Sequence, residues 1–306
     1  MDSPLTLTVP SDLDGERLDR ALAVLLDVSR AVARGLVDAG VEIDGVVSKP
    51  NTKVTTGSTI IAPHPVKPAA MLAEPMELVL LYEDDALAVI DKPPGLVVHP
   101  GSGQMIGTLA AGLLHRYPEL EGVGDVDRWG LVHRLDKDTS GAILVGRTRE
   151  AFAGLVEQLR ARKIRRTYLG LVEGVLKPPT GTIEAPIGRD PQVPTRRAVS
   201  REGKPATTHY RVLTNYEDHD LAYVSVNLET GRTHQIRVHF AAIGHPVVGD
   251  PAYGTRRDAG LSPRIFLHAG ELSFVHPVSG ETLVVTSPLP ADLSAVLARL
   301  ETSDDN

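Results

Sequence analysis

The chain has 306 residues, of which 42% are hydrophobic and 23% charged, a composition typical of a globular protein with a substantial core. The absence of cysteine excludes disulfides, thiolate nucleophiles and cysteine-ligated metals, and the net charge of −7 argues against a protein that coats nucleic acid without selectivity. Because no apolar run approaches the roughly 18–20 residues that span a bilayer, and the first residues lack a signal-peptide pattern, we expect a cytoplasmic protein without membrane contact.

The first part of the chain predicts a small module of two helices and a hairpin. Two successive segments, 16–27 and 29–40, carry apolar residues at helical spacing, and the second runs from a serine that can cap a helix to a glycine that can end one. A strand–turn–strand pattern follows around Asp44–Gly45, a dipeptide that favours a tight hairpin turn. We place this module at residues 15–62, followed by a Pro- and Ala-rich linker at 63–75.

Residues 76–302 show a different pattern, with many short β-type runs separated by glycine and proline. Strands are expected at 77–85, 87–100, 141–148, 167–176, 208–217, 220–231, 264–274 and 281–288, and helices at 106–117, 149–162, 233–244 and 292–301. Because strands outnumber helices and follow one another in consecutive runs, we predict an α+β fold. Its sheet should be mixed and mainly antiparallel, with the small N-terminal α/β domain as a separate part.

A charged sequence, HRLDKDTSG, lies between the apolar runs that begin at Leu131 and end at Val145. It combines Asp136 and Asp138 with cationic neighbours, which can keep a carboxylate ionised as a base or nucleophile. Alternatively, Asp136 is a turn or cap residue with Arg134 as its surface partner, since Asp is an ordinary turn former. The apolar runs on either side of it, including the one that begins at Leu131, look like strands. A charged cluster between two strands is energetically costly unless it forms a cleft.

A second polar cluster is THQIRVHF. A helix that starts at Thr233 would place His234 and Arg237 on one face and aim the guanidinium at a cleft. The apolar side of that helix would consist of Ile236, Phe240 and Ile243. A surface helix with a solvated Arg is the alternative. We predict no metal site, because His234 and His239 are five positions apart with no Glu between them in the HExxH manner.

A third feature is an aromatic residue beside a basic run. RARKIRR places five cations within residues 160–166, Tyr168 follows directly, and further Arg pairs occur at 196–197 and 256–257. Tyr168 is suited to stack on a nucleic-acid base, and equally to pack as an ordinary strand residue. Each basic run alone is compatible with a solvated surface. Their recurrence beside a charged loop indicates RNA or another phosphate-bearing ligand.

Three of these motifs, HRLDKDTSG, RRTYLGLVEG and GRTHQIRVHFAAIGHPVVGDPAYG, together resemble the signature sequences of the RluA-type RNA pseudouridine synthases, in the branch that acts on large-subunit ribosomal RNA. The resemblance runs from about residue 15 to 290 and includes DKPPGLVVHPG, which is similar to the opening strand pair of the family. The first module resembles the S-four-type RNA-binding domain through RLD at 17–19, SR at 29–30 and VEIDG at 41–45.

The resemblance implies a specific reaction. Uracil is detached from its ribose within an RNA chain, turned over, and rejoined through a ring carbon. As an isomerisation, this reaction needs no redox cofactor, no ATP and no metal, so no cofactor is expected. The expected partner is large-subunit ribosomal RNA or its precursor, and the enzyme is expected to be a monomer.

The resemblance also assigns roles to residues. Asp136 corresponds to the essential aspartate, Arg237 to the arginine that pairs with it, and Tyr168 to the aromatic residue that stacks on the target base. Arg134 corresponds to the residue that helps to hold the base out of its helix. Two neighbours in these motifs are expected to bind substrate as well: His133 and His234.

Two other classes of function remain open from the residues alone. A glycoside hydrolase or nucleosidase would use Asp136 and Asp138 as its carboxylate pair, but two carboxylates in one loop need not face each other across a bond. A non-catalytic ribosome-assembly factor would use the small module and the basic patches only to bind RNA. Free uracil would reveal the first alternative, and physiological activity without modification would reveal the second.

Overall fold

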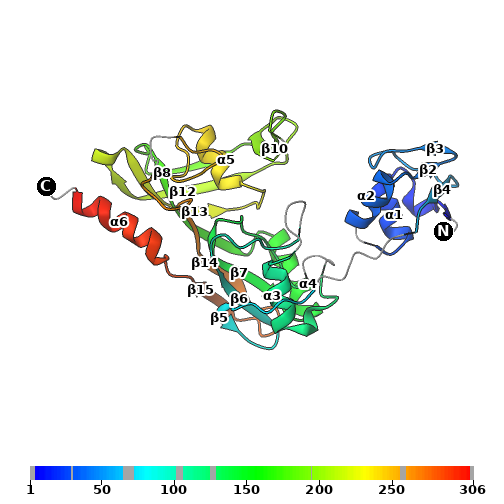
Figure 1. Cartoon of the computed structure of the whole chain (residues 1–306), viewed down its shortest axis with the longest axis horizontal. Helices are drawn as coiled ribbons and strands as arrows, with labels where there is room; N and C mark the ends of the chain where they lie inside the picture. Colours follow the sequence, from blue (N-terminus) through cyan, green and yellow to red (C-terminus); the bar gives the residue numbers. More distant parts are fainter. Residues whose placement is uncertain are drawn as a thin grey trace. The chain divides into compact units, whose positions relative to one another are not determined.

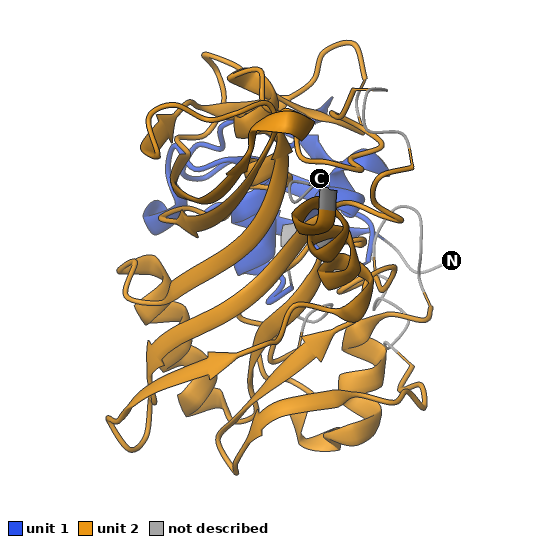
Figure 2. Ribbon diagram, turned by 90° about the vertical axis from the view of Figure 1, so that its left-hand side faces the viewer, with its two compact units in different colours: residues 1–71 blue, residues 72–306 orange. Residues whose placement is uncertain are grey.

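The computed structural model describes residues 4–28, 30–64, 72–100, 106–124, 129–193, 195–255 and 260–303. The chain divides into two compact units, residues 1–71 and 72–306, which Figure 2 shows in different colours. The expected helix cap Ser29 and the Arg pair at 256–257 lie outside the described residues. Across the described ranges, no helix is long and apolar enough to cross a membrane.

Unit 1 combines a four-stranded antiparallel sheet with two short helices (Figure 1). Its elements are β1 (Leu5–Thr8), η1 (Ser11–Leu13), α1 (Leu18–Leu25), α2 (Arg30–Asp38), β2 (Glu42–Ile43), β3 (Val46–Val47) and β4 (Thr59–Ala62). Both predicted helices and the hairpin are present, with Asp44 and Gly45 at φ 51° and 81°. Leu18 and Leu22 of α1 are fully buried in the core of this unit. Strand β1 was not predicted, and because it pairs with β4, the folded unit begins before residue 15.

Unit 2 contains a nine-stranded sheet whose main order is β5-β6-β7-β14-β8-β13-β12-β9, with β15 paired to β14. The strands are β5 (Val79–Glu83), β6 (Leu87–Lys92), β7 (Ser140–Gly146), β8 (Arg165–Glu173), β9 (Thr180–Glu184), β12 (Thr207–Tyr216), β13 (Leu221–Leu228), β14 (Leu267–Val275) and β15 (Thr282–Thr286). The helices are α3 (Leu109–Arg116), η2 (Pro118–Leu120), α4 (Arg149–Arg160), η3 (Glu217–His219), α5 (Gln235–Ala242) and α6 (Ala291–Ser303). Among these pairings only β7 and β14 run parallel. The predicted α+β fold with a mainly antiparallel sheet is therefore confirmed.

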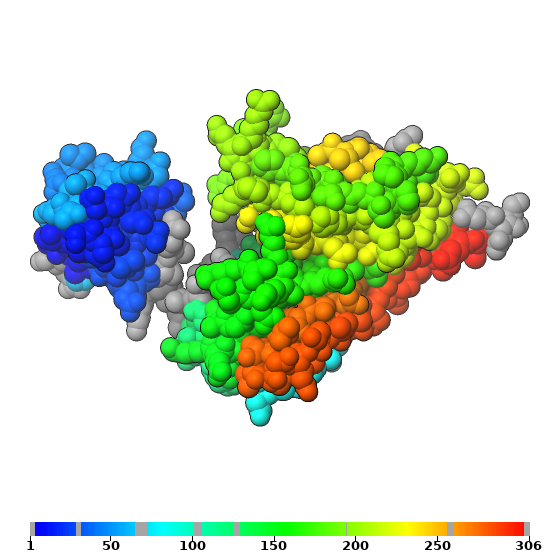
Figure 3. Space-filling view, turned by 180° about the vertical axis from the view of Figure 1, so that it is seen from behind, coloured from blue at the N-terminus to red at the C-terminus, as the bar shows by residue number. Residues whose placement is uncertain are grey.

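The core of unit 2 includes two large apolar clusters, one on each half of the long sheet. In one half, α4 packs against β6, β7 and β14, and in the other α6 packs against β8 and β13. Figure 3 shows α4 and β15 (green and orange) in one half and β12 and β13 (yellow-green) in the other. Strand β7 is buried along its whole length, because both of its neighbours and α4 cover it. It therefore supplies a rigid base for the loop that precedes it.

The apolar run that begins at Leu131 is not a strand, contrary to the prediction. Leu131 forms only an isolated bridge with Val145, and the N–H of Val132 donates to the carbonyl of Leu144 at 3.3 Å. The chain thus lies antiparallel to β7 in an irregular conformation. Gly130 allows this close approach, since a Cβ at its φ of +76° would lie 2.7 Å from the carbonyl oxygen of Gly146.

A small arm between β9 and β12 was also not predicted. It consists of β10 (Ile187–Arg189) and β11 (Arg197–Val199), which pair with each other as a separate two-stranded sheet. Its strands are only three residues long and carry charged residues, so the sequence shows no clear alternation there. The arm lies next to the N-terminal end of α5, because the backbone N–H of Arg197 donates to the hydroxyl of Tyr253 and Tyr253 contacts His234.

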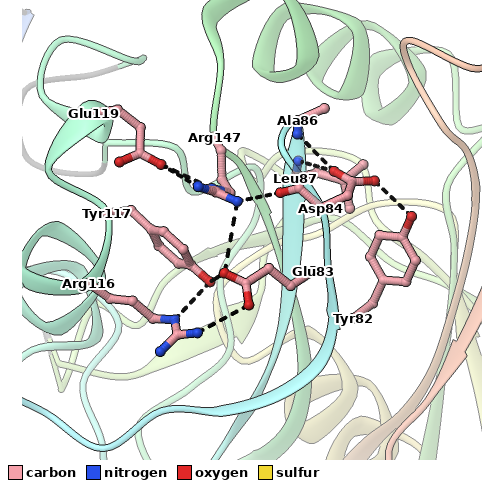
Figure 4. Close-up of polar contacts among 9 residues, drawn as sticks. All are labelled: Tyr82, Glu83, Asp84, Ala86, Leu87, Arg116, Tyr117, Glu119 and Arg147. Atoms are coloured by element: carbon pink, nitrogen blue, oxygen red, sulfur yellow. Dashed lines mark hydrogen bonds and ion pairs between the residues drawn. The ribbon is translucent and has the colours of Figure 1, made fainter.

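A polar network connects the C-terminal end of β7 to β5, the edge strand of the sheet (Figure 4). Arg147, directly after β7, lies over the ring of Tyr117 at 4.4 Å and donates to Glu119 at 2.7 Å and to the backbone carbonyl of Asp84. The hydroxyl of Tyr117 donates to Glu83 of β5 at 2.7 Å. Burial raises the pKa of Tyr117, with the carboxylate of Glu83 acting in the same direction, so its hydroxyl remains a donor.

Candidate active site

One cleft of about 570 Å³ brings together all six residues singled out from the sequence. The residues that line it include the charged loop before β7, the first part of β8, and the segment from the end of β13 into α5. The predicted site residues among them are His133, Arg134, Asp136, Tyr168, His234 and Arg237. Because these segments come from both halves of unit 2, the cleft forms only when the whole sheet has assembled.

Asp136 occupies the turn that leads into β7. Its carbonyl accepts a hydrogen bond from the N–H of Thr139 at 3.2 Å, which closes the turn. Its carboxylate Oδ2 lies 3.2 Å from Nη1 of Arg237, and the two side chains are 17% and 10% exposed. The ion pair is therefore largely shielded from solvent while Asp136 stays accessible from the cleft, as a reacting carboxylate requires.

Arg237 is held mainly by a residue that the sequence reasoning did not single out. Asp250 has a fully buried side chain and receives two parallel hydrogen bonds from Arg237, Nε to Oδ2 at 2.7 Å and Nη2 to Oδ1 at 2.8 Å. Oδ1 also accepts the backbone N–H groups of Ala252 and Tyr253. Although burial lowers the pKa of Arg237, its two carboxylate partners raise it further, so the guanidinium stays charged.

Helix α5 starts later than predicted. Its first helical residue is Gln235 rather than Thr233, and His234 precedes it in the left-handed region at φ 58°. Arg237 is therefore on the first turn of the helix, and His234 does not share a helical face with it. Ile236 and Phe240 are buried as expected, whereas Ile243 is 40% exposed and does not belong to the apolar side. The left-handed turn was not visible in the sequence, because non-glycine residues rarely adopt it.

His234 and Arg237 meet instead on the ring of Tyr253, a second residue that was missed. The Nδ1 of His234 lies 2.9 Å from the hydroxyl of Tyr253, and the guanidinium of Arg237 lies 5.1 Å from the ring centroid. Burial lowers the pKa of His234. The sequence signal for both missed residues was the motif GDPAY, in which Asp250 and Tyr253 follow a buried valine pair.

Tyr168 lies on the strand β8 and points into the cleft. It is 5% exposed, and burial raises the pKa of its hydroxyl. Arg166 is two positions earlier, and both side chains are buried between more exposed neighbours, so they share the cleft face of the strand. Tyr168 thus lines the same cleft as Asp136.

His133 and Arg134 take different positions at the start of the charged loop. The Nε2 of His133 accepts a hydrogen bond from the N–H of Leu144 at 3.0 Å. Burial and the nearby charge of Arg166 lower the pKa of His133 to about 3, so the ring is neutral at physiological pH. Arg134 is exposed, and its Nη1 lies 3.4 Å from Nε2 of His99 on the wall of the cleft.

A buried lysine supports the charged loop from behind, and it too was missed. Lys92 is fully buried and donates hydrogen bonds to the carbonyls of Pro93, Leu96 and Lys137 at 2.8, 3.0 and 2.9 Å. Burial lowers its pKa to about 7. Its contact with Lys137 joins the end of β6 to the residue next to Asp136. The motif DKPPG contained this residue, but its spacing says nothing about the loop 45 positions later.

The charge of the cleft differs from that of the whole chain. Its lining carries two carboxylates, Asp136 and Glu229, and a larger set of guanidinium groups. These are Arg134, Arg160, Arg162, Arg166, Arg232 and Arg237. Glu229 is paired with Arg162 at 2.5 Å, so the surface left for a ligand is positive. A local positive cleft on a chain of net charge −7 favours selective binding of a polyanion.

The two histidines considered for zinc have separate partners. His239 is buried and contacts Thr208 and the carbonyl of Ala185, whereas His234 contacts Tyr253. Throughout the part of the chain that the structure describes, no group of three or more His, Asp or Glu side chains is placed to hold a metal ion. Asp138, the second carboxylate of the loop, is exposed and does not line the cleft.

Comparison with known proteins gives consistent matches. Residues 86–242 match the RNA pseudouridylate synthase family. The chain is 47% identical to a ribosomal large subunit pseudouridine synthase D of Nitrosomonas europaea, covering 97% of this chain and 88% of the relative. It is 42% identical to the protein of the same name from Pseudomonas aeruginosa, covering 95% and 94%. An uncharacterized RNA pseudouridine synthase of Bacillus subtilis is 41% identical, covering 97% and 98%.

Two solved structures share the fold over about three quarters of this chain. The human RNA pseudouridylate synthase domain-containing protein 4 has a TM-score of 0.58 at 26% identity, covering 73% of this chain and 93% of that one. Protein 1 of the same name has a TM-score of 0.55 at 27% identity, covering 74% and 97%. With a cleft that joins Asp136, Arg237 and Tyr168, and with relatives matched over nearly its whole length, this chain belongs to the RNA pseudouridylate synthase family.

Proposed function

We propose that the chain converts specific uridines of large-subunit ribosomal RNA, or of its precursor, to pseudouridine, with Asp136 as the reacting carboxylate. The substrate class is supported by the printed names of the relatives from Nitrosomonas europaea and Pseudomonas aeruginosa. The observation that carries the proposal is the ion pair between Asp136 and Arg237, which lies in a positive cleft beside the ring of Tyr168.

Arg134 and Tyr168 have separate roles in the proposed reaction. A uridine inside a helix hides its glycosidic bond, so the enzyme must extrude it at a cost of a few kcal/mol of unstacking. Arg134, exposed at the loop, can occupy the vacated space with its planar cation. Tyr168 replaces the lost stacking on the base. In the cleft the N1–C1′ bond breaks and a C5–C1′ bond forms, while C5 loses a proton and N1 gains one.

Asp136 must be ionised for either route to glycosidic cleavage. As a nucleophile it attacks C1′, and as a base it removes the C2′ proton. Arg237 favours the ionised form of Asp136 in both routes. It also fixes the direction of the Asp136 carboxylate, because Asp250 prevents the guanidinium from turning. His133 and His234 line the same cleft and contact the substrate in this proposal.

Unit 1 is proposed to bind RNA in the manner of an S-four-type domain. Its support is the compact arrangement of α1 and α2 with a small sheet and the motifs quoted above. We further propose that the protein acts as a monomer in the cytoplasm without contact to a membrane. Light scattering of the purified chain, with and without RNA, tests the oligomeric state directly.

The proposed function is tested by mapping pseudouridines in a transcript of large-subunit ribosomal RNA treated with the purified protein. Asp136→Asn should lower the rate by about a thousandfold or more while binding persists, because only the charge is removed. Asp138→Asn is the matched control and should stay within about threefold. Unmodified RNA after treatment with the wild-type protein contradicts the proposal. Release of free uracil would instead indicate a nucleosidase.

A mapping experiment in cells separates catalysis from a role in ribosome assembly. The ribosomal RNA of a strain that lacks the gene should lose particular pseudouridines, which the wild-type gene restores and Asp136→Asn does not. If Asp136→Asn restores growth fully without restoring the modification, RNA binding alone is the physiological role.

A further inference from the structure

Three buried polar atoms in the described residues have no hydrogen-bond partner, and all three belong to residues that line the cleft. They are Nδ1 of His133, Oγ1 of Thr139 and Nε of Arg166. Thr139 and Arg166 are only 2% and 6% exposed. Buried polar groups are nearly always hydrogen-bonded, because an unmade bond costs the desolvation of the group. Their convergence on one cleft indicates that a ligand supplies the missing partners.

Arg166 is a donor with a fixed position. It shares the cleft face of β8 with Tyr168, and its Nη2 donates to the carbonyl of Leu228 at 3.4 Å. Its Nη1 lies against Gly231, where a Cβ would approach to 2.8 Å. These contacts hold the guanidinium plane on the side of Leu228 and Gly231 and leave the Nε–H group for a ligand. A guanidinium nitrogen can donate but not accept.

His133 is a second fixed donor. Because Nε2 accepts the N–H of Leu144, a neutral ring must carry its proton on Nδ1. Thr139 is different, since a hydroxyl can also accept a hydrogen bond. It belongs to the turn of Asp136, three residues after the carboxylate, whereas His133 is three residues before it. The three residues with unpartnered groups line the same cleft as the reacting carboxylate and the stacking ring.

We propose that Arg166 and His133 donate to the two carbonyl oxygens of the target uracil and that Thr139 accepts from its N3–H group. The proposal rests on the function proposed above and names the residues that recognise the base. Uracil presents O2, N3–H and O4 along one edge, an acceptor, a donor and an acceptor. Cytosine presents an amino donor in place of O4, so two donor groups would face each other at that position. At its unprotonated N3 the hydroxyl of Thr139 can donate instead of accept, so cytosine mismatches one of the three protein groups.

The same pattern suits the rotation of the base during the reaction. Replacing N1 by C5 at the ribose is equivalent to turning the ring half a revolution about the axis through N3 and C6. This turn exchanges O2 with O4 and leaves N3–H in place. Two donors on either side of one acceptor therefore bind the base equally before and after rotation. The three protein groups that contact this edge of the base therefore need no rearrangement while the base is detached.

The test measures base discrimination as well as rate. First, the wild-type protein and a large-subunit ribosomal RNA transcript identify a modified site, and a stem-loop containing it is made with uridine or cytidine at that position. In an Asp136→Asn background, which removes turnover, the stem-loop with uridine should bind about tenfold or more tightly than the one with cytidine. Arg166→Lys, which keeps the charge but removes the Nε donor, should reduce this preference to within about twofold.

Thr139→Val provides a second variant that removes the hydroxyl at nearly constant shape. It should lower kcat/KM on the uridine stem-loop about tenfold or more. Arg165→Lys, the exposed neighbour on the opposite face of β8, is the control and should change neither quantity by more than about twofold. Thermal unfolding of each variant shows that the fold is retained.

Two outcomes overturn the inference. One is a uridine preference that survives in Arg166→Lys. The other is an equal loss of affinity for uridine and cytidine stem-loops in Arg166→Lys, which would place a phosphate rather than a base carbonyl on Arg166. Failure of the wild-type protein to modify the transcript would instead refute the proposed function, so the two failures are distinguishable.

Discussion

The Nη1 atom of Arg237 lies 3.2 Å from Oδ2 of Asp136, although the two residues are 101 positions apart. The other two guanidinium nitrogens of Arg237 are both engaged by Asp250. One arginine thus joins a fully buried carboxylate to a partly accessible one. Asp250 fixes the plane of the guanidinium, and the remaining donor then fixes the direction of Asp136.

Asp250→Asn should destabilise the fold and slow the reaction together. The substitution leaves Arg237 buried with one carboxylate partner, and breaking a buried pair typically costs about 3–5 kcal/mol. Urea unfolding measures this loss, and single-turnover kinetics measures the rate. Asp292→Asn is the control, because the Asp292–Arg264 pair is more exposed and should contribute about 0–1 kcal/mol. Equal effects of the two substitutions would contradict a special role for Asp250.

Arg237→Lys should lower kcat by about a hundredfold with little change in KM. A single ammonium group cannot donate to both oxygens of Asp250 and also orient Asp136. Steady-state kinetics on a modified stem-loop measures both constants. Arg211→Lys, at an exposed position of β12, should leave both constants unchanged. Near-wild-type kcat in Arg237→Lys would show that charge alone, without geometry, is sufficient.

Lys92→Met should lower kcat through the position of the charged loop. It removes the donor to three backbone carbonyls, including that of Lys137 beside Asp136, and should cost about 2–4 kcal/mol of stability. Unfolding in urea and kcat on the stem-loop are measured together. The neighbouring exposed Lys137→Met is the control. If Lys92→Met lowers only stability and leaves kcat unchanged, the loop does not depend on this support.

His133→Gln should make the protein less sensitive to acid. The folded-state pKa of His133 is lowered to about 3, below its ordinary value near 6.5, so the unfolded chain takes up this proton first. Stability from the neutral ring is therefore complete above about pH 6.5 and is lost as the pH falls toward about 3, by at most about 1.4 kcal/mol per pH unit. Urea unfolding of wild type and variant across this range measures the difference.

The acid sensitivity has its own control. His209→Gln changes a histidine whose side chain is 40% exposed, and it should leave the slope of stability against pH nearly as in the wild type. Parallel curves for wild type and His133→Gln between about pH 6.5 and 3 would show that the ring is not held neutral.

Much of the local structure could be predicted from the sequence. The helices α1, α4 and α6 follow from apolar residues at helical spacing, and the hairpin around Asp44–Gly45 from its turn dipeptide. These features depend on residues a few positions apart, so the pattern carries their information. The nature of the site was predictable in the same way, because Asp136, Tyr168 and Arg237 each lie within a recognisable motif.

The misses have a common physical origin. Lys92 acts on a loop 45 positions away, Asp250 binds Arg237 of α5 from a loop 13 positions further on, and His234 adopts a left-handed conformation that no propensity favours. The run at Leu131 has strand composition, yet it forms only an isolated bridge with Val145, while β14 pairs with β7 at Ser140 and Gly141. Each outcome depends on tertiary contacts rather than on the local sequence pattern.

The sequence by itself determined the helices, most of the strands, the small first unit and the chemical identity of the reacting groups. Only the tertiary structure decided that Arg237 divides its donors between Asp250 and Asp136, and that His133, Thr139 and Arg166, each with an unpartnered buried atom, line one cleft. The physical reason is that periodicity and turn chemistry are local. A side chain can point toward a partner about a hundred residues away only after the sheet has assembled.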